Sequence, residues 1–370
     1  MRLFFLMLIC LQYMMAADEV KTLATGQRAP DFTLPGIDGR MYSLNDFRDA
    51  NLLVIVFTAC HCPTAQAYED RIIKLVNDYK DKGVTLIAIS SNNPEAVCPE
   101  ELGYTDLSDS FDDMKIRAAD KKFNFIFLYD GDKQEVAHAY GPVATPHVFI
   151  FDKDRKLRYN GRIDDMENPY KEPSTTDTRN AIEALLAGRA VPVEKTKVFG
   201  CSMKWLSKIE LHRQLDEQWA AKPVSVHMIN TPAIRDLIAN KSDTLRLINV
   251  YATWCGPCIV EFPELVTIQR MYGGRKFEVI SVSADKPSQG EKVQNFLKKN
   301  QAAFKNYLFD TDDIYRLIEA VDPAWDGAIP YTLLVAPGGK IIYRQMGIID
   351  PLKVKKAIVG QLGRFFADDK

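Results

Sequence analysis

The sequence predicts an α/β protein made of two tandem modules, each a central mixed β-sheet flanked by helices. Two observations lead to this prediction. Strand-like and helix-like patterns alternate along both halves of the chain. Each half also has an apolar strand that runs into a cysteine-bearing turn and then into a helix. A chain of 370 residues is longer than one ordinary domain and is consistent with two.

The first half begins its pattern with an apolar strand at residues 52–57, which leads to Cys60 and Cys62. A helical pattern follows over residues 65–79. Thr145-Pro146 then stands at the head of a hairpin. The remaining elements expected in this half are a strand at 84–90, helices at 112–121 and 134–140, a strand at 125–129, the hairpin strands 148–151 and 157–159, and a helix at 178–186.

The second half repeats this outline. An apolar strand at 245–251 leads to Cys255 and Cys258, a helix follows to about residue 271, and Ile329-Pro330 stands before a hairpin. The remaining elements expected are strands at 277–283 and 307–309, helices at 290–300 and 313–320, hairpin strands at 331–335 and 341–343, and a closing helix at 351–366.

The N-terminus predicts a secretory signal peptide at residues 1–17, because Arg2 is followed by an apolar stretch too short to span a bilayer and then by Ala16 and Ala17. An uncleaved anchor is the alternative. We expect an exported protein, periplasmic or cell-envelope, with no stable membrane insertion after cleavage. The predicted domains are a first α/β unit at 25–200, a tail and linker at 201–223, and a second unit at 224–370.

Composition narrows the function. The net charge is −2 and no basic patch interleaved with aromatic residues occurs, so no nucleic-acid partner is expected. Six cysteines follow the signal segment, too few for a disulfide scaffold in so long a chain. Their clustering behind apolar strands predicts catalytic redox pairs instead. The acidic stretch 100–113 is interpreted as a solvated loop.

The strongest motif is the C-x-x-C pair Cys255 and Cys258. Orphan amides at a helix N-terminus favour a thiolate at Cys255, which makes it the expected nucleophile. Cys258, one turn later, is placed to resolve a mixed disulfide. A static disulfide or a zinc site is the alternative, but no cysteine or histidine after Cys258 supplies further zinc ligands. We therefore expect no metal and no organic cofactor.

The second half resembles the thioredoxin superfamily, and within it the exported TlpA/ResA-like thiol-disulfide oxidoreductases. The resemblance rests on Trp254-Cys255-Gly256-Pro257-Cys258, on the run 247–254 before it, and on Ile329-Pro330. It implies a cis peptide bond at Pro330, beside the sulfurs. It also implies that Glu261 is a partly buried carboxylate that exchanges protons with the thiols, where the residues alone would indicate a surface glutamate. The residues expected to face substrate are Trp254, Pro257, Pro330 and Pro146.

The first half resembles the redoxin branch that contains the AhpC/TSA peroxiredoxins. The resemblance rests on the run 29–34, on Cys62-Pro63 with Tyr68-Glu69-Asp70-Arg71, and on Gly200-Cys201-Ser202-Met203-Lys204. The nucleophile motif P-x-x-x-[ST]-x-x-C is absent, since Ala59 stands three residues before Cys62. Cys62 is still the expected reactive thiol, with either Cys60 or Cys201 as its partner. His61 either lowers a thiol pKa, binds a metal, or is a solvent-facing loop residue.

These patterns predict an exported thiol-disulfide oxidoreductase that reduces disulfides of client proteins, and the resemblance implies a membrane thiol-disulfide reductase as its electron donor. Two alternatives remain at this point. In one, Cys62 reduces peroxide and the second module regenerates it, which makes the chain a fused thiol peroxidase. In the other, the first module is a non-catalytic binding scaffold.

Overall fold

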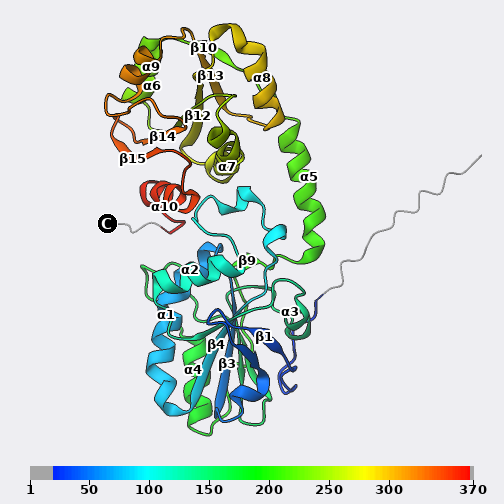
Figure 1. Cartoon of the computed structure of the whole chain (residues 1–370). Helices are drawn as coiled ribbons and strands as arrows, with labels where there is room; N and C mark the ends of the chain where they lie inside the picture. Colours follow the sequence, from blue (N-terminus) through cyan, green and yellow to red (C-terminus); the bar gives the residue numbers. More distant parts are fainter. Residues whose placement is uncertain (1–19, 367–370) are drawn as a thin grey trace, which may run out of the picture.

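The computed structural model describes residues 20–366 and forms two α/β units, one above the other in Figure 1. Helix α5 (Ile209–Ala220) connects them along one side. The predicted signal peptide at residues 1–17 lies outside the described residues. Within the described part of the chain, no helix is both long and apolar enough to span a lipid bilayer.

The first unit is built on a mixed five-stranded sheet with the order β5-β4-β3-β7-β8. The first three of these run parallel and the last two are antiparallel hairpin strands. The strand bounds are β3 Leu52–Thr58, β4 Val84–Ser90, β5 Ile126–Tyr129, β7 His147–Phe151 and β8 Leu157–Gly161.

Both faces of this sheet are buried, which explains why β3 is buried at every position and apolar from Leu52 to Phe57. Leu52, Val54 and Val56 pack against α1 (Pro63–Tyr79) and α4 (Asp177–Leu186). The alternate residues of β3 pack on the other face against β1 (Thr33–Pro35) and α3 (Glu135–Tyr140). Strand β2 (Met41–Ser43) pairs with β1, and helix α2 (Phe111–Lys121) packs on β4 and β5.

The second unit repeats this plan with a mixed six-stranded sheet, ordered β10-β13-β12-β11-β14-β15. Its strands are β10 His227–Ile229, β11 Leu245–Tyr251, β12 Phe277–Ser283, β13 Lys305–Phe309, β14 Tyr331–Val335 and β15 Ile341–Met346. One face carries α7 (Gly256–Tyr272), α8 (Gly290–Lys299) and α10 (Pro351–Leu362), and the other carries α6 (Thr231–Ala239) and α9 (Ile314–Val321). The predicted fold class, two tandem α/β units with mixed sheets, is confirmed.

Several elements differ from the sequence prediction. The charged stretch inside the predicted linker 201–223 contains helix α5, in which Trp219 is the buried residue. Leu211, Leu215 and Trp219 recur at helical spacing in α5, but charged and polar residues outnumber the apolar ones, so the stretch was interpreted as a linker. Strands β1 and β2 have three residues each, too few to display alternation. The closing helix α10 ends at Leu362 rather than at residue 366.

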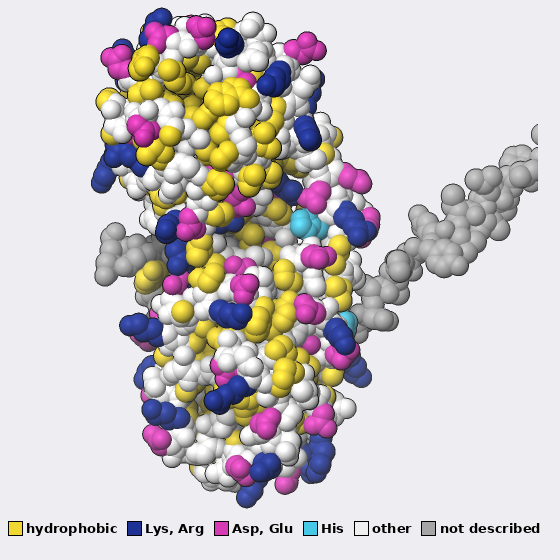
Figure 2. All heavy atoms as spheres, in the orientation of Figure 1, with side chains coloured by type: hydrophobic (Ala, Val, Ile, Leu, Met, Phe, Trp, Pro, Cys, Tyr) yellow, Lys and Arg dark blue, Asp and Glu magenta, His cyan; other side chains and the backbone are white. Residues whose placement is uncertain are grey.

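The two units share a packed interface. The C-terminal turn of α7 lies against the 3-10 helix η4 (Pro99–Leu102), and the hydroxyl of Tyr272 donates to the carbonyl of Thr105 at 2.7 Å. Ion pairs surround this contact, joining Arg270 to Glu100, Arg364 to Asp106 and Lys356 to Asp120. Segment 91–110 of the first unit therefore supplies much of the surface that contacts the second unit. Charges of both signs are spread over both units on the face shown in Figure 2.

Candidate active sites

The Cys255–Cys258 disulfide lies where strand β11 ends and helix α7 begins. Cys255 is the N-cap of α7, and the backbone N–H of Cys258 donates to its Sγ at 3.3 Å. Pro257 occupies the first turn, where its missing N–H costs nothing. Cys255 retains 6% of its surface exposed, whereas Cys258 is fully buried. Of the two sulfurs, that of Cys255 is the one an incoming thiol can reach.

The surface around this disulfide is apolar and open. Trp254 is 63% exposed, and Ile259 and Val260 in the first turns of α7 are exposed as well. Sγ of Cys255 lies 3.6 Å from the carbonyl oxygen of Ile329. The Ile329-Pro330 bond is cis, as the resemblance implied, and Pro330 itself is buried.

Glu261 is buried beneath this turn, with 3% of its surface exposed, so the interpretation as a surface glutamate is wrong. Its carboxylate accepts from Nδ2 of Asn249 at 2.7 Å and from the backbone N–H of Ile349 at 2.9 Å. Burial raises the pKa of Glu261, and the two donors oppose that rise. A carboxyl with a raised pKa is suited to exchange protons with the nearby thiols, and that role remains a prediction.

Cys62 occupies the same place in the first unit. It is the N-cap of α1, and its Sγ accepts from the backbone N–H of Ala65 at 3.4 Å. The thiol donates to the carbonyl of Thr145 at 3.3 Å. The Thr145-Pro146 bond is cis and Pro146 is buried, so the arrangement matches that of Cys255 beside Ile329-Pro330. Unlike Cys255, Cys62 has no exposed surface.

His61 is buried, so the interpretation as a solvent-facing loop residue is wrong. Its Nδ1 lies 2.5 Å from Oδ2 of Asp109, which is also fully buried. Asp109 accepts three further hydrogen bonds, from the backbone N–H groups of Cys60 and His61 and from Nδ2 of Asn92. Burial alone would lower the pKa of His61, but Asp109 outweighs this and raises it.

Asp109 belongs to the acidic stretch 100–113, which we expected to be a solvated loop. That interpretation is wrong for Asp109 and for Asp106, both of which are buried. The stretch folds back over the cysteine turn, about fifty residues earlier in the sequence. No spacing rule in the sequence links positions so far apart, so His61 and Asp109 were not recognised as a pair.

The structure brings Cys201, rather than Cys60, against Cys62. Cys201 lies on the short strand β9 (Cys201–Ser202), which pairs with β6 (Ala144–Thr145), and it packs on the cluster that contains Cys62. Cys60 points into a different apolar cluster with Met114 and Phe127. Burial and the charge of Asp109 raise the pKa of Cys60 well above its usual range. Because Cys60 lies in a different cluster from Cys62, it is the less favourably placed candidate partner.

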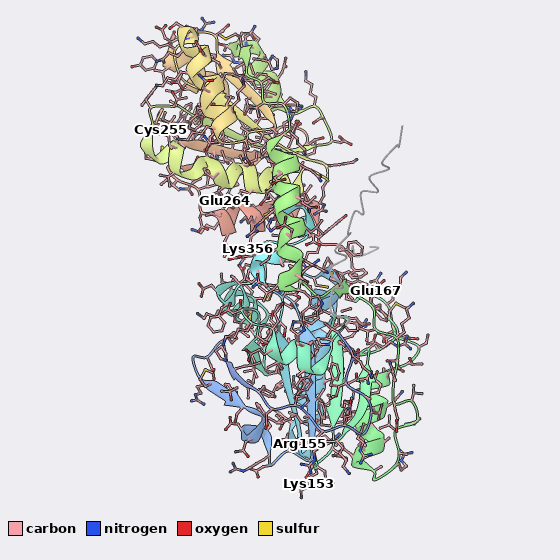
Figure 3. The ribbon with its side chains drawn as sticks, turned by 90° about the vertical axis from the view of Figure 1, so that its right-hand side faces the viewer. Lys153, Arg155, Glu167, Cys255, Glu264 and Lys356 are labelled. Atoms are coloured by element: carbon pink, nitrogen blue, oxygen red, sulfur yellow. A yellow bond between two sulfur atoms is a disulfide. The ribbon has the colours of Figure 1, made fainter. Side chains whose placement is uncertain are left out.

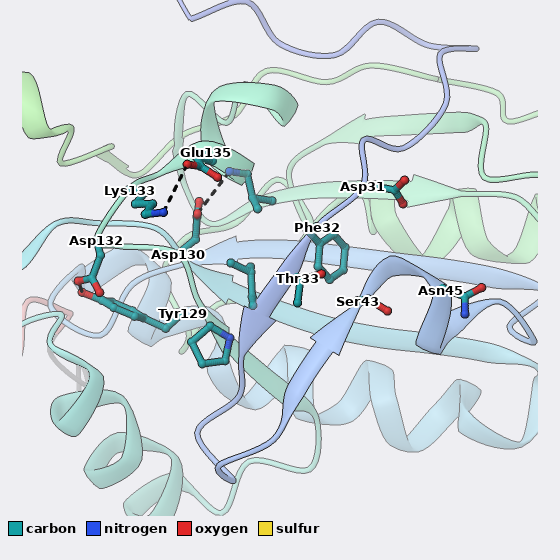
Figure 4. Close-up of a pocket in the computed structure, with 13 residues that line it drawn as sticks. Asp31, Phe32, Thr33, Ser43, Asn45, Tyr129, Asp130, Asp132, Lys133 and Glu135 are labelled. Atoms are coloured by element: carbon teal, nitrogen blue, oxygen red, sulfur yellow. Dashed lines mark hydrogen bonds and ion pairs between the residues drawn. The ribbon is translucent and has the colours of Figure 1, made fainter.

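A hollow of about 700 Å³ lies on the first unit beside β1, and Figure 4 shows its lining. The carboxylate of Asp130 accepts from the backbone N–H groups of Val136 and Ala137 at the start of α3. Burial raises the pKa of Asp130 to about 6. No cysteine lines this hollow, so it is separate from both cysteine turns.

The sequence pattern of one protein family occurs twice in this chain. The AhpC/TSA pattern matches residues 25–160 and 233–344, which together exceed half of the chain. The chain belongs to the AhpC/TSA family. The first matched segment contains Cys62 and the second contains Cys255 and Cys258, so each cysteine turn lies inside a copy of the family pattern. The predicted relationship to the thioredoxin superfamily is confirmed.

Individual relatives agree with this membership. The thiol-disulfide oxidoreductase ResA of Geobacillus thermodenitrificans is 25% identical over 157 residues, covering 41% of this chain and 79% of ResA. The thiol:disulfide interchange protein CycY of Rhizobium leguminosarum is 27% identical over 158 residues, covering 40% and 75% of the two proteins. A protein of Mycobacterium tuberculosis, provisionally named a peroxiredoxin, is 36% identical over 75 residues, covering 20% and 46%. The chain is thus an oxidoreductase enzyme of the thiol-disulfide type.

A solved structure is also similar. An uncharacterized conserved protein of Geobacillus kaustophilus shares 38% identity, with 49% of this chain and 92% of that chain covered and a TM-score of 0.44.

Proposed function

We propose that the Cys255–Cys258 pair is the centre at which this protein exchanges disulfides with client proteins. The observation that supports this most directly is the disulfide itself, at the N-terminus of α7 with Cys255 as the N-cap. A sulfur in that place receives N–H donors and faces the positive end of the helix dipole, which stabilises its thiolate.

In the reduced enzyme, the Cys255 thiolate attacks a client disulfide, and one client sulfur leaves with its electron pair. Cys258 then attacks Sγ of Cys255 in the mixed disulfide, which releases the second client sulfur and closes the Cys255–Cys258 bond. Glu261, buried on the next turn of α7, takes the proton that Cys258 must lose before it attacks. The client gains two electrons and the enzyme loses two.

The exposed apolar side chains around the Cys255–Cys258 disulfide are suited to bind a protein client. Trp254 and Val260, close to the disulfide in the sequence, expose most of their surface. Met346 and Ile348 are also exposed, and they flank Gly347, whose N–H donates to the carbonyl of Pro330. An extended peptide segment would bury these side chains while its disulfide reaches Cys255.

The direction is the one implied by the resemblance to the TlpA/ResA-like oxidoreductases, and the location rests on the predicted signal peptide. We place the protein in the periplasm or cell envelope, where it reduces client disulfides and a membrane thiol-disulfide reductase returns it to the dithiol state. The in-cell redox state of Cys255 and Cys258, fixed by rapid acid quenching and alkylation, tests this. A mostly reduced pair is expected, and a mostly oxidised pair would reverse the direction.

The alternative in which the second unit regenerates Cys62 of the same chain is disfavoured by the geometry. Cys258 lies in the first turn of α7, whereas Tyr272, its last residue, contacts Thr105 of the first unit. The helix rise separates these two residues by about 21 Å. Figure 3 shows Cys255 at an edge of the upper unit, away from the lower one. Direct exchange would require this interface to open.

A further inference from the structure

We propose that Cys62 and Cys201 form a second dithiol–disulfide centre, in which Cys62 is the thiolate, Cys201 is its exchange partner, and the His61–Asp109 pair holds the compensating proton. This centre goes beyond the function proposed above, since it uses neither Cys255 nor Cys258. Four parts of the chain build it: the turn before α1, segment 91–110, the Thr145-Pro146 step and strand β9.

The backbone brings the two cysteines together. Strand β9 pairs with β6 so that Cys201 lies opposite Thr145, whose carbonyl also accepts from the thiol of Cys62. Gly200 makes this approach possible. Its φ is +134°, and a Cβ at that position would lie 2.0 Å from the carbonyl oxygen of Thr145. A side chain at residue 200 would therefore push Cys201 away from Cys62.

The surroundings of Cys62 stabilise a thiolate. The backbone N–H of Ala65 points at its Sγ from the first turn of α1. The hydroxyl of Thr145 is buried nearby and has no hydrogen-bond partner within residues 20–366, so it is free to donate to a thiolate. Burial alone would raise the pKa of Cys62, but the Cys201 thiol, the charge of His61 and the Thr145 hydroxyl together lower it to about 6. The same contact with Cys62 raises the pKa of Cys201, so that Cys201 stays protonated.

The His61–Asp109 pair supplies the positive charge. Asp109 accepts four hydrogen bonds, and His61 outweighs burial to keep the pKa of Asp109 below its usual value. An ionised Asp109 keeps the proton on His61. The other charged side chains around the cluster are paired among themselves, Arg117 with Glu69 and Lys204 with Glu101. The thiolate of Cys62 therefore has His61 as its cationic neighbour.

The difference in exposure between Cys62 and Cys201 decides which sulfur an incoming thiolate attacks. Cys62 has no exposed surface, whereas Cys201 is partly exposed. A thiolate of an external dithiol therefore attacks Sγ of Cys201 in the disulfide state, and Cys62 leaves with the electron pair as the low-pKa thiolate. The second thiolate of the donor then attacks the donor's own sulfur in the mixed disulfide. This releases Cys201, which takes up one proton of the donor, while the donor's other proton passes to solvent. The Cys62 thiolate is balanced by the proton that His61 already carries, and the donor leaves as a disulfide.

Disulfide mapping tests the pairing. In the full chain carrying Cys255→Ser and Cys258→Ser, equilibration in glutathione and glutathione disulfide buffers followed by peptide mapping should yield a Cys62–Cys201 linkage. Dithiothreitol should reverse it. Cys201→Ser should abolish the linkage, whereas Cys98→Ser, which changes another buried cysteine, should leave it intact. A Cys60–Cys62 linkage, or a Cys62 thiol that stays free in glutathione disulfide alone, would overturn the proposal. Because the second unit is inactive in this background, the outcome is independent of the function proposed for it.

A second measurement tests whether the His61–Asp109 pair stabilises the Cys62 thiolate. Ultraviolet absorbance of the thiolate, followed against pH in the same background, should show the midpoint of Cys62 rising by about one unit or more in His61→Asn and in Asp109→Asn. His138→Asn is the matched control, because His138 is exposed and its ring packs against Trp205 instead. An unchanged midpoint in both His61→Asn and Asp109→Asn would remove the pair from the centre.

Discussion

The two cysteine turns of this chain share one backbone plan and differ in what covers them. In each, an apolar strand ends, a cysteine forms the N-cap of a 17-residue helix, and the carbonyl before a cis-proline lies beside its sulfur. Cys62 of the first turn is fully buried, whereas Cys255 of the second is bordered by the exposed Trp254. Local geometry therefore sets where the sulfur is, and more distant segments decide what can reach it.

The covering segments explain the difference. After strand β4, segment 91–110 folds back over the first turn and carries Asp109, which binds the N–H groups of Cys60 and His61. In the second unit, Asp285 follows strand β12 almost directly and binds the N–H and hydroxyl of Thr253. Both carboxylates brace the cysteine turn, but the longer segment also buries it. The second cysteine beside the first turn is Cys201, which lies on the distant strand β9. The second cysteine of the second turn is Cys258, which lies in the helix that the turn begins.

The largest expected effect lies at the open turn. Cys255→Ser should abolish reduction of a disulfide-linked protein such as insulin, because the attacking sulfur is gone. Cys258→Ser should instead accumulate mixed disulfides with clients, visible as shifted bands on non-reducing gels. The single variant Cys62→Ser should leave both results unchanged. Trapping by the Cys255→Ser variant would show that the two roles are reversed.

The bracing carboxylates offer a matched test of stability. Asp109→Ala should cost about 3–5 kcal/mol, because it leaves a buried imidazolium without its partner. Asp285→Ala should cost less, about 2 kcal/mol, since it removes hydrogen bonds from neutral donors. Urea-dependent hydrogen exchange, read on peptides from β3 and β11, measures the two losses separately. Equal losses would mean that His61 is neutral in the folded protein.

The cost of Asp109→Ala should depend on pH. The pKa of His61 is raised, so its contribution is full below the unfolded value of about 6.5 and is lost as pH rises through the folded value. The pKa of Asp109 is lowered, so its contribution is full above about 3.9 and is lost as pH falls further. The penalty should thus be greatest between about pH 4 and pH 6.5. A penalty that grows steadily toward alkaline pH would contradict the ion pair.

A smaller effect is expected at Glu261. Its charge opposes a nearby thiolate, so Glu261→Gln should lower the thiol pKa of the Cys255/Cys258 pair by up to about one unit. Thiolate absorbance of the reduced protein against pH measures the shift. Glu264→Gln is the control, because Glu264 lies on the same helix but pairs with Lys355. If both variants titrate alike, Glu261 does not act on the sulfurs.

The smallest effect belongs to the interface. Tyr272→Phe removes the hydrogen bond to the carbonyl of Thr105 and should cost about 1 kcal/mol. Because Thr105 also accepts from Nε2 of Gln66 in α1, the loosened contact should increase hydrogen exchange in segment 91–110. Tyr315→Phe, on an exposed face of the second unit, should change neither quantity. Equal exchange in the two variants would show that segment 91–110 is rigid without the second unit.

Much of this architecture was predictable because patterns of a few neighbouring residues determine it. Strands β4, β11, β12 and β14 match their predicted residues in full, since buried strands are rich in apolar and β-branched residues. The paired turns and the C-x-x-C motif were equally visible. Helix α5 was missed because charged and polar residues dominate its stretch, and strands β1 and β2 were missed because three residues give no alternation to detect.

The sequence by itself determined the two-unit α/β plan, the position of each cysteine at a helix start, and Cys255 as the sulfur more available for attack. Only the tertiary structure decided that Cys201 meets Cys62, that His61 is buried against Asp109, and that one turn is closed while the other is open. The reason is physical. Helix and strand patterns act over a few residues, whereas these contacts join positions about fifty to one hundred and forty residues apart, which only the folded chain brings together.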